Sequence, residues 1–557
     1  MPQVVFGPRN FQESVDDFVR NTSTGIVSLS KFHHQALKCS REYDAFVANR
    51  TQNDIAQYVI DFFQGTGWME NKILFFGYYF NKTIFSPLDS RVRLNYQMPL
   101  AFLLGILACC LVSLVLLVQR SAQGLKESQS ASEEVFYGSF NKVFCGWDYN
   151  LAEDQAALLK HKNLKQDYES TLSAQRAAEN MKQMTQCQKV CMYITRALVN
   201  IFVLAVIGAS FYLIYYVQEQ SAQLTASTSN SRELSLLVQY LPSLTITVLN
   251  IIVPFIFQKV VTLEKYSPDF EIRITIFRTV VLRLASLLFL LVSMRSVILN
   301  CRGEGQKICG VCNNAGFKCW ETYVGQQIYK LVILNFIVTT LVTCLVEFPR
   351  GFLVTRFDGK LCQLIGRQEF DISKNVLDVI YTQTLCWLGT FFCPLIPAMT
   401  LVKMFVFFYL KKASLLVNCE PPKRAFRSSQ SNSFFMLVLL ASFVIVCIIP
   451  VGYSIGNISP SQGCGAFRVY STEDFYMYTV IKDLVRSWPM PVPYIYFLIG
   501  SFAVLIPLAV ILILVIVYYA ARISSSKKLA EILKERLALE GKDKQFLLKR
   551  VNEAIHS

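Results

Sequence analysis

The chain has 557 residues, of which 53% are hydrophobic, and a mean hydropathy of +0.38. Soluble domains are about 45–50% apolar, and here the excess is collected in runs long enough to cross a bilayer, which excludes an ordinary soluble protein. The formal net charge is +15. The basic residues lie between the apolar runs and no nucleic-acid-binding motif is present, so no nucleic acid is expected as a partner.

Residues 1–97 contain no run of spanning length and no secretory signal, because MPQVVFGPRN lacks a basic start followed by an apolar stretch. N-glycosylation sequons occur here at Asn21, Asn49 and Asn81 and further along at Asn457. These asparagines are glycosylation candidates if they face the outside or a lumen.

Nine apolar runs predict an all-α polytopic membrane protein with about nine transmembrane helices. The runs are Met98–Val118, Ala197–Val217, Leu234–Phe257, Thr279–Leu299, Ile328–Val346, Val376–Leu395, Ala398–Leu410, Phe434–Val451 and Tyr494–Tyr519. The sixth and seventh are separated only around Pro394 and Pro397, which allows either a tight hairpin or one broken helix. The hairpin keeps the loop charges consistent.

The loop charges predict the orientation, because cytoplasmic loops are rich in Lys and Arg. The basic segments, expected inside, are 119–196, 258–278, 347–375, 411–433 and 520–557. The segments poorer in basic residues, expected outside, are 218–233, 300–327 and 452–493. This alternation places residues 1–97 outside as well.

The expected organisation follows from these spans. Residues 1–97 are expected to form an outer N-terminal segment, and residues 98–257 three spans with a cytoplasmic helical loop at 119–196. Residues 258–411 are expected to contain the pore-forming spans with a Cys-rich outer loop at 300–327. Residues 412–519 then hold the last two spans, and residues 520–557 a basic cytoplasmic C-terminal helix. The loop 119–196 contains a run of helix formers without Pro or Gly. That run predicts either a platform for a soluble partner or a solvated connector.

The outer loop carries four cysteines, Cys301, Cys309, Cys312 and Cys319. Four thiolates that include a CxxC pair suit tetrahedral zinc. The oxidising outer compartment favours two disulfides instead, with the pairing left open and no metal expected.

Charged residues in spans cost on the order of 3 kcal/mol each, so they face a polar pathway or pair with one another. The fourth to seventh spans contain Arg283, Arg295, Lys330, Asp378 and Lys403 in or at the edges of the apolar runs, accompanied by Asn250, Asn335 and Gln383. Their concentration in one half of the bundle favours a hydrated pathway. The four histidines form no catalytic pattern with a nucleophile and no nucleotide-binding motif is present, so neither an enzyme nor a cofactor is expected.

One stretch combines a motif with a span. It begins with Cys319, Trp320, Glu321 and Thr322 (CWET) and continues through GQ and YKL into the fifth run. This stretch resembles the signature of the TMC (transmembrane channel-like) family. Further similar blocks are FGYY at 76–79, LEKYSPDFEIRITIFR at 263–278, EFDISKNVLDVIYTQT at 369–384 and FRSSQSNSFF at 426–435, so the resemblance covers roughly residues 76–550.

The resemblance implies an anoctamin-like bundle, a homodimer, and a groove lined by the third to sixth spans. It also implies ten spans, so either the chain is an N-terminally shortened form, which is the expectation, or Met98–Val118 itself acts as the export signal. Similar inner helices in this family contact calcium- and integrin-binding (CIB) proteins, which makes 119–196 a candidate CIB site. Asn335 stands where hearing-associated members have Asp, which places the chain nearer the other branches.

The expected function is therefore a mechanically responsive ion channel subunit with weak cation selectivity. The pore candidates are Asn250, Arg283, Lys330, Asn335, Asp371, Asp378 and Gln383, with Asp371 and Asp378 attracting cations. The alternative is a non-conducting scaffold that regulates ion transport or ion homeostasis through soluble partners. The plasma membrane is the expected location, with the endoplasmic reticulum as the alternative.

Overall fold

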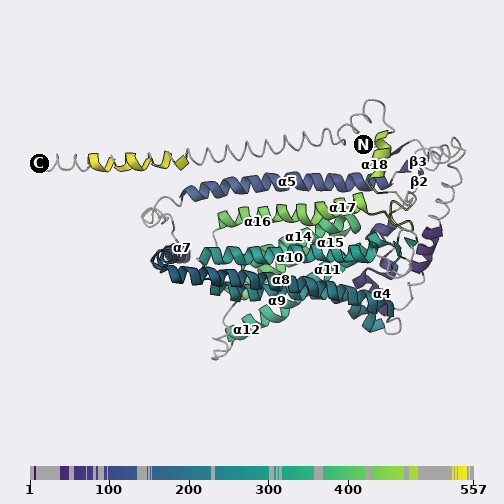
Figure 1. The fold of residues 1–557 in the computed structure, drawn as a ribbon, viewed down its shortest axis with the longest axis horizontal. Helices are drawn as coiled ribbons and strands as arrows, with labels where there is room; N and C mark the ends of the chain where they lie inside the picture. The colour runs from purple at the N-terminus through teal and green to yellow at the C-terminus, as the bar shows by residue number, and fades with distance from the viewer. Residues whose placement is uncertain are drawn as a thin grey trace. The chain divides into compact units, whose positions relative to one another are not determined.

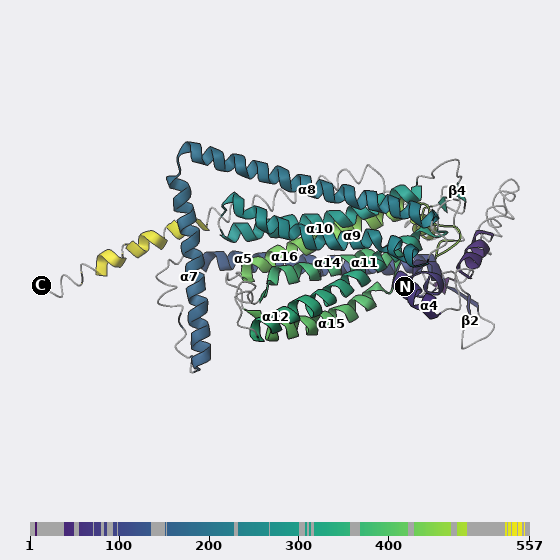
Figure 2. The same ribbon diagram turned by 90° about the horizontal axis from the view of Figure 1, so that it is seen from below.

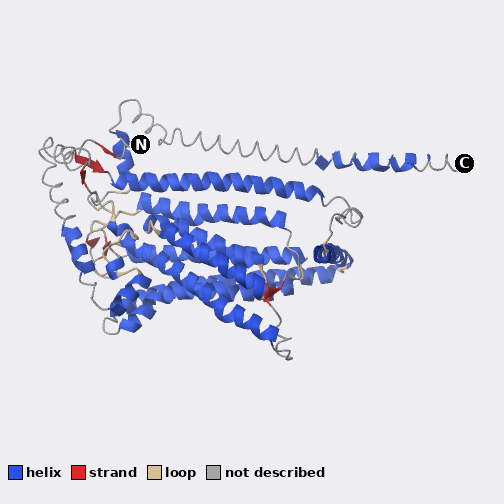
Figure 3. Cartoon of the chain, turned by 180° about the vertical axis from the view of Figure 1, so that it is seen from behind, coloured by secondary structure: helices blue, strands red, loops and turns tan. Residues whose placement is uncertain are grey.

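The computed structural model shows a bundle of long helices with a few very short strands at its ends (Figure 1, Figure 3). The residues described are 6–7, 38–48, 55–70, 72–79, 83–85, 93–96, 98–134, 147, 151, 153–227, 232–266, 268–299, 307–308, 311–312, 317–356, 368–420, 428–468 and 476–486, together with 530–531, 533–535, 537–542, 544–548 and 551.

The first described elements are β1 (Phe6–Gly7), a helix over residues 38–48, α4 (Ile55–Gln64), η1 (Gly67–Met69), η2 (Phe76–Tyr78), β2 (Thr83–Phe85), β3 (Arg93–Tyr96), α5 (Met98–Glu134) and α7 (Asp154–Gln183). Those that follow are α8 (Gln186–Ser227), α9 (Arg232–Val261), η3 (Thr262–Glu264), α10 (Pro268–Leu299), β4 (Lys307–Ile308), β5 (Val311–Cys312), α11 (Trp320–Val342), η4 (Thr343–Glu347) and α12 (Phe348–Arg356). The last are β6 (Gln368–Glu369), α14 (Ile372–Phe392), α15 (Ile396–Val417), β7 (Cys419–Glu420), α16 (Ser428–Ser442), η5 (Phe443–Ile448), α17 (Ile449–Asn457) and α18 (Thr479–Arg486).

Six of the described helices are long and apolar enough to cross a membrane: Met98–Gln123, Gln186–Ser221, Val238–Glu264, Phe270–Arg295, Trp320–Val354 and Phe434–Asn457. A spanning segment must satisfy its backbone polar groups internally, which the helix does. The protein is therefore an all-α polytopic integral membrane protein, as the sequence predicts. The count of nine spans stays a prediction, and its ninth run, Tyr494–Tyr519, lies outside the described residues.

The sixth and seventh runs form two helices, α14 and α15, joined by a turn at Cys393–Leu395. Pro397 lies in the first turn of α15, where its missing N–H has no helical partner to lose. The backbone N–H of Ile396 donates to the carbonyl of Cys393 at 3.0 Å and closes the turn. The hairpin interpretation is thus correct, and the single broken helix is wrong.

Two apolar clusters hold the long helices together. One joins α8, α9 and α10 through Val199, Val203, Ile207, Val253, Phe257 and Leu282. The other joins α10, α14 and α16 through Ile276, Val280, Leu377, Ile380, Phe435 and Val438. The helix α10 belongs to both clusters, and α14 packs against it in the second one. This packing holds together the two helices that carry Arg283 and Asp378.

The bundle has two different ends. At one end α7 crosses the direction of the long helices and contacts α10 (Figure 2). At the opposite end lie α4 and the three-stranded sheet β1-β3-β2 (Figure 1). Within Met1–Tyr478, α7 belongs to the segment 119–196 predicted inside and α4 belongs to residues 1–97 predicted outside, and the two lie at opposite ends of the bundle; the orientation itself stays a prediction.

The residues from Thr479 onward form a second unit, separate from Met1–Tyr478. It contains α18 and helical turns between residues 530 and 551. The helical character expected for the C-terminal tail is therefore present, although the predicted domain divisions remain untested.

Candidate functional site

A cavity of about 170 Å³ lies among α9, α10, α11 with η4, and α14. These are the four helices expected to line a groove. The side chains at its wall include Thr247, Asn250, Ile251, Pro254, Phe255, Gln258, Thr275, Thr279, Arg283, Asn335, Thr339, Thr343, Glu347, Glu369, Asp371, Lys374, Asp378, Tyr381 and Lys411. The wall is therefore rich in amides, hydroxyls and charges even though the helices are apolar overall. That ions pass through it stays a prediction.

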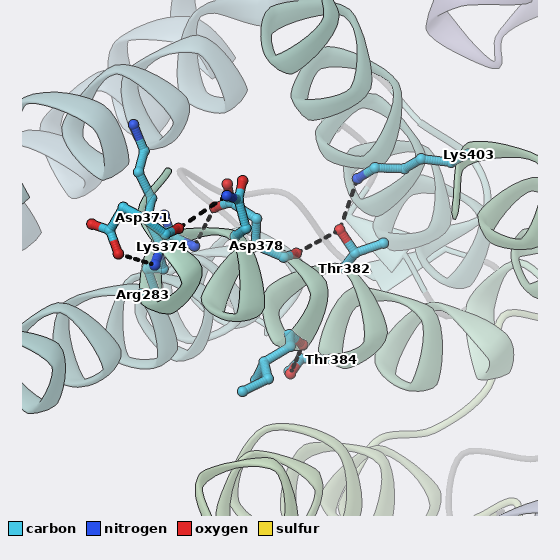
Figure 4. A network of polar contacts seen from close by, with 9 residues as sticks. Arg283, Asp371, Lys374, Asp378, Thr382, Thr384 and Lys403 are labelled. Atoms are coloured by element: carbon cyan, nitrogen blue, oxygen red, sulfur yellow. Dashed lines mark hydrogen bonds and ion pairs between the residues drawn. The ribbon is translucent and has the colours of Figure 1, made fainter. Parts of the chain in front are cut away.

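An ion pair crosses the cavity between α10 and α14. Arg283 Nη1 lies 2.7 Å from Asp378 Oδ1, and the two side chains are 9% and 25% exposed (Figure 4). The guanidinium also lies 5.8 Å from the ring centre of Tyr381, one turn further along α14. Each partner removes the cost that the other would have as an isolated charge.

Two polar atoms at this cavity lack hydrogen-bond partners among the described residues, Arg283 Nε and Asn250 Oδ1. Both belong to side chains of the cavity wall. Pro254 has no N–H to donate to the backbone carbonyl of Asn250 four residues earlier, so α9 offers a further acceptor at this level. Buried polar atoms are nearly always satisfied. A donor and acceptors left open at one cavity are suited to a hydrated ion.

The first turn of α14 brings two more charges to the cavity. Asp371 is the N-cap residue, and its carboxylate accepts a hydrogen bond from the backbone N–H of Lys374 at 3.1 Å. The Lys374 ammonium lies 5.6 Å from the Phe255 ring centre on α9. Figure 4 shows both residues beside the Arg283–Asp378 pair. Asp371 therefore has a structural role at the helix start in addition to its place on the cavity wall.

A second ion pair belongs to the cavity wall on the side nearer the α7 end. Lys411 Nζ on α15 lies 3.0 Å from Glu347 Oε1, and it also donates to Thr343 Oγ1 at 3.2 Å. Ser414 Oγ donates to Glu347 Oε2 at 2.8 Å. Glu347 ends η4, one turn of π-helix, a conformation that is frequent at functional sites. This cluster links α11 to α15.

Lys403 on α15 is buried and approaches α14 from another side than Arg283 (Figure 4). Its ammonium donates to Thr382 Oγ1 at 2.9 Å, and Thr382 Oγ1 donates to the carbonyl of Asp378 at 2.8 Å. Among the described residues, no carboxylate lies within 4.0 Å of Lys403 Nζ to form a salt bridge. A positive charge thus lies close to the ion pair without being neutralised by direct contact.

The structure gathers five of the seven pore candidates around the cavity: Asn250, Arg283, Asn335, Asp371 and Asp378. Lys330 lies nearer the α4 end, where it donates to Gln239 Oε1 at 3.5 Å and lies 5.8 Å from the Tyr240 ring centre. Gln383 is half-buried on α14 outside the cavity wall. The sequence did not single out Glu347, Lys374 or Lys411. These residues lie at or just beyond the ends of the predicted spans, where a charge is ordinarily solvated.

The CWET motif joins α11 to the residues at the α4 end. Cys319 forms a disulfide with Cys464. The backbone N–H and the indole N–H of Trp320 donate to Ser461 Oγ at 3.2 Å and to the carbonyl of Ser459 at 3.1 Å. The next two motif residues act as acceptors: Glu321 Oε1 from the N–H of Ser461 at 2.8 Å, and Thr322 Oγ1 from the N–H of Gly77 at 3.1 Å. All four motif residues therefore attach the start of α11 to segments distant in the sequence, around Gly77 and Ser459–Cys464.

The disulfide corrects one expectation and leaves another open. Because Cys319 pairs with Cys464, the four cysteines of the outer loop do not form two bridges among themselves. Cys301 and Cys309 lie outside the described residues, and only the backbone of Cys312 is described. Of the glycosylation candidates, Asn457 is exposed at the end of α17, whereas Asn21, Asn49 and Asn81 lie outside the described residues.

Next to the motif, Tyr43 is buried in an apolar cluster with Val47, Cys319 and Cys464. Its hydroxyl donates to Glu70 Oε1 at 3.4 Å. Burial, together with the negative charge of Glu70, raises the pKa of Tyr43 well above its usual value. The cluster therefore keeps this tyrosine neutral over the physiological range.

The fold and the site together define a polytopic membrane protein with a charged, polar cavity among four of its long helices. Comparison with known proteins agrees with that class. The TMC domain matches residues 319–429. Voltage-gated chloride channel TMC4 of Mus musculus is 36% identical over 495 residues, which cover 87% of this chain and 68% of the relative. The Homo sapiens protein of the same name is 35% identical over 89% of this chain and 68% of the relative. Transmembrane channel-like protein 8 of Homo sapiens is 33% identical over 87% of this chain and 65% of the relative.

The chain belongs to the TMC family, as the CWET stretch indicates. It spans about two thirds of the length of these relatives. The relatives carry names of channels or channel-like proteins, so the family is a channel-like one.

Proposed function

We propose that the chain is a pore-forming subunit of an ion channel and that the cavity among α9, α10, α11 and α14 is part of its ion pathway. The observation that carries the proposal is the Arg283–Asp378 pair at a cavity wall that also holds open polar atoms. Charged side chains inside spans are costly and are usually functional. The charged pair and these polar atoms share one cavity wall, which supports a hydrated pathway there.

The buried charges favour anions. In the helices around the pathway, three ion pairs neutralise Arg278 with Glu264, Arg283 with Asp378, and Lys411 with Glu347. Lys403 adds a buried positive charge beside the second of these pairs, and no carboxylate of the described residues lies within 4.0 Å of its ammonium. A net positive field along a pore favours anions. The relatives named as chloride channels support the same preference.

Weak cation selectivity is the competing proposal, and the cavity wall itself supports it. The wall holds four carboxylates, Glu347, Glu369, Asp371 and Asp378, against three basic groups, Arg283, Lys374 and Lys411. If the narrowest part of the pathway lies at this cavity rather than near Lys330 and Lys403, cations are preferred. Of the two carboxylates expected to attract cations, Asp378 is weaker than Asp371, because Arg283 neutralises Asp378 at 2.7 Å.

Membrane tension is the stimulus we propose, and voltage is its competitor. Ile251 and Phe255 belong to the cavity wall, yet their side chains are 39% and 56% exposed on α9, so lipid packing acts directly on that wall. Voltage is supported by the printed name of the relatives and by the buried charges, since a charge that moves through the membrane field does electrical work. Pressure steps at fixed voltage and voltage steps at fixed pressure on the same patch separate the two.

The experiment that tests channel function is a current measurement on the purified chain in liposomes or planar bilayers under a sodium chloride gradient. A current whose reversal potential lies toward the chloride equilibrium potential supports an anion channel, and one toward the sodium potential supports the cation alternative. Absence of current from protein with correct folding and insertion rejects the channel and favours a non-conducting scaffold. Lys403→Gln is the matched variant, because it removes one buried positive charge from the same protein.

Assembly and location are proposals as well. We expect a homodimer in the plasma membrane, with the endoplasmic reticulum as the alternative location, and a CIB-type protein bound at 119–196. The exposed side chains Leu158 and Leu159 on α7 support the binding of a partner there. Mass photometry of the purified chain measures the dimer, and co-purification with and without Leu158→Asp measures the dependence on α7.

A further inference from the structure

The helix α4 carries its apolar face on the outside. Its exposed side chains are Ile55, Tyr58, Val59, Phe62 and Phe63, which recur at the spacing of one helical stripe. The opposite face carries Asp61 and Gln64, which are 3% and 5% exposed. A helix on a water-facing surface has the reverse arrangement. The exposed stripe therefore requires a cover that is not water.

The polar face of α4 is used within the protein. Thr66 Oγ1 donates to Asp61 Oδ1 at 3.2 Å, and the backbone N–H of Gly65 donates to the carbonyl of Asp61 at 2.7 Å. Gly65 has φ +70°, and a Cβ there would lie 2.5 Å from the ring of Phe75, so the turn that ends α4 requires glycine. These contacts fix the turn that ends α4 on the side of the helix opposite the apolar stripe.

The last carbonyl groups of α4 are attached to two spanning helices. Tyr240 of α9 donates its hydroxyl to the carbonyl of Phe63, and Tyr329 of α11 donates to the carbonyl of Phe62 at 2.6 Å. Gln326 Nε2 of α11 donates to the carbonyl of Gly65 at 2.9 Å. All three donors lie within the candidate spans Val238–Glu264 and Trp320–Val354. The C-terminal end of α4 is therefore held against parts of α9 and α11 that belong to candidate spans.

The helix α9, to which α4 is attached, exposes apolar side chains as well. Directly after Tyr240, α9 exposes Leu241, Leu244 and Val248. Tyr58 and Trp68 form a ring pair with centres 6.0 Å apart, and the Trp68 indole donates to the carbonyl of Tyr58 at 3.1 Å. Such aromatic residues are enriched where a protein crosses the membrane–water interface.

We infer that α4 is an interfacial helix whose apolar face is covered by phospholipid of the leaflet at the α4 end of the bundle (Figure 1, Figure 2). The helix lies in the interface with its aliphatic and aromatic side chains among the acyl chains. Through Phe62, Phe63 and Gly65 it attaches this leaflet to α9 and α11, two helices of the cavity wall. The inference does not depend on ion conduction.

The test places the photoreactive residue p-benzoylphenylalanine at Val59 or at Phe62 in the full chain, reconstituted in phosphatidylcholine liposomes. The matched control is Lys72, an exposed charged residue in the same part of the chain. After illumination, mass spectrometry is expected to find phosphatidylcholine adducts at Val59 and Phe62 and none at Lys72. A cross-link to a second copy of the chain, or to another protein, would replace lipid as the cover and overturn the inference. Equal lipid labelling at all three positions, or none at Val59 and Phe62, would overturn it too.

Discussion

Arg283 on α10 and Asp378 on α14 form an ion pair at 2.7 Å, although the two residues are 95 positions apart in the sequence. Each residue alone is a charge in an apolar segment. Together they form a neutral bridge that joins two walls of the cavity, with a neighbouring positive charge at Lys403 and a neighbouring N-cap at Asp371. The pair therefore links these two walls and leaves little net charge at this part of the cavity.

Breaking this pair is expected to destabilise the protein. Asp378→Asn leaves Arg283 without its counter-charge, a change that costs about 3–5 kcal/mol for fully buried pairs. We expect the low end or less, because Asp378 is 25% exposed. The melting temperature of the purified chain measures the loss. The double variant Arg283→Gln with Asp378→Asn should recover most of it. Simple addition of the two single losses would show that the residues are not coupled.

Removing the charge of Lys403 is expected to weaken anion preference. Lys403→Gln keeps a hydrogen-bond donor for Thr382 but removes the positive charge, whereas Lys403→Arg retains the charge and serves as the control. Under a sodium chloride gradient, the reversal potential of the Gln variant should move toward the sodium potential, and that of the Arg variant should not. A charge near a partly desolvated pore acts more strongly than the same charge in water, so one substitution is measurable.

The cation alternative has its own pair of variants. If Asp371 attracts cations, Asp371→Asn lowers cation preference, and Asn335→Asp raises it. Asparagine is as good an N-cap as aspartate, so α14 should keep its start in the first variant. Reversal potentials that stay unchanged in both variants while Lys403→Gln shifts would assign selectivity to the buried lysine. The opposite pattern would assign it to the carboxylates of the cavity.

The sequence predicted the class of fold because long apolar runs allow few structures in a membrane. It also named five residues of the cavity wall, since polar groups inside such runs are conspicuous. It could not pair Arg283 with Asp378, or Cys319 with Cys464, because both contacts join distant segments. Glu347 and Lys411 were missed for a different reason. They lie at span ends, where a charge is ordinarily solvated, and only the packing of η4 against α15 shows that they meet inside the protein.

The disulfide of the CWET motif is expected to be detected directly. Digestion of the non-reduced chain should release one peptide pair linked through Cys319 and Cys464. Cys464→Ser should remove that pair and lower the melting temperature, since the bridge joins positions 145 residues apart. Cys447→Ser, at a buried free cysteine, is the control for a lost thiol. Peptides that link Cys319 to Cys301, Cys309 or Cys312, or a stoichiometric zinc ion without disulfides, would contradict the structure.

Tyr43 is expected to make stability fall at high pH. Its pKa in the folded chain is raised well above the value of about 10 that it has when unfolded. At pH values below about 10, the tyrosine is protonated in both the folded and the unfolded state, and its burial contributes fully to stability. As the pH rises above about 10, the unfolded state loses the proton while the folded state keeps it, so the free energy of unfolding declines. Melting temperatures at a series of alkaline pH values should fall less steeply in Tyr43→Phe than in the unmodified chain. Tyr478→Phe, at a 41% exposed tyrosine, should leave the slope unchanged.

The attachment of α4 to the cavity helices predicts a change in response to lipid without a change in ion preference. Tyr240→Phe and Tyr329→Phe each remove one hydroxyl that donates to a carbonyl of α4, a loss of about 1 kcal/mol per hydrogen bond, and leave the ring in place. If channel currents depend on tension carried through this helix, the double variant should need a larger pressure step for half-maximal current. Its reversal potential should stay the same, because Arg283, Lys403 and Asp371 are untouched. Tyr212→Phe, on the exposed face of α8, is the matched control. An unchanged pressure response in the double variant would show that α4 rests in the interface without transmitting force to α9 and α11.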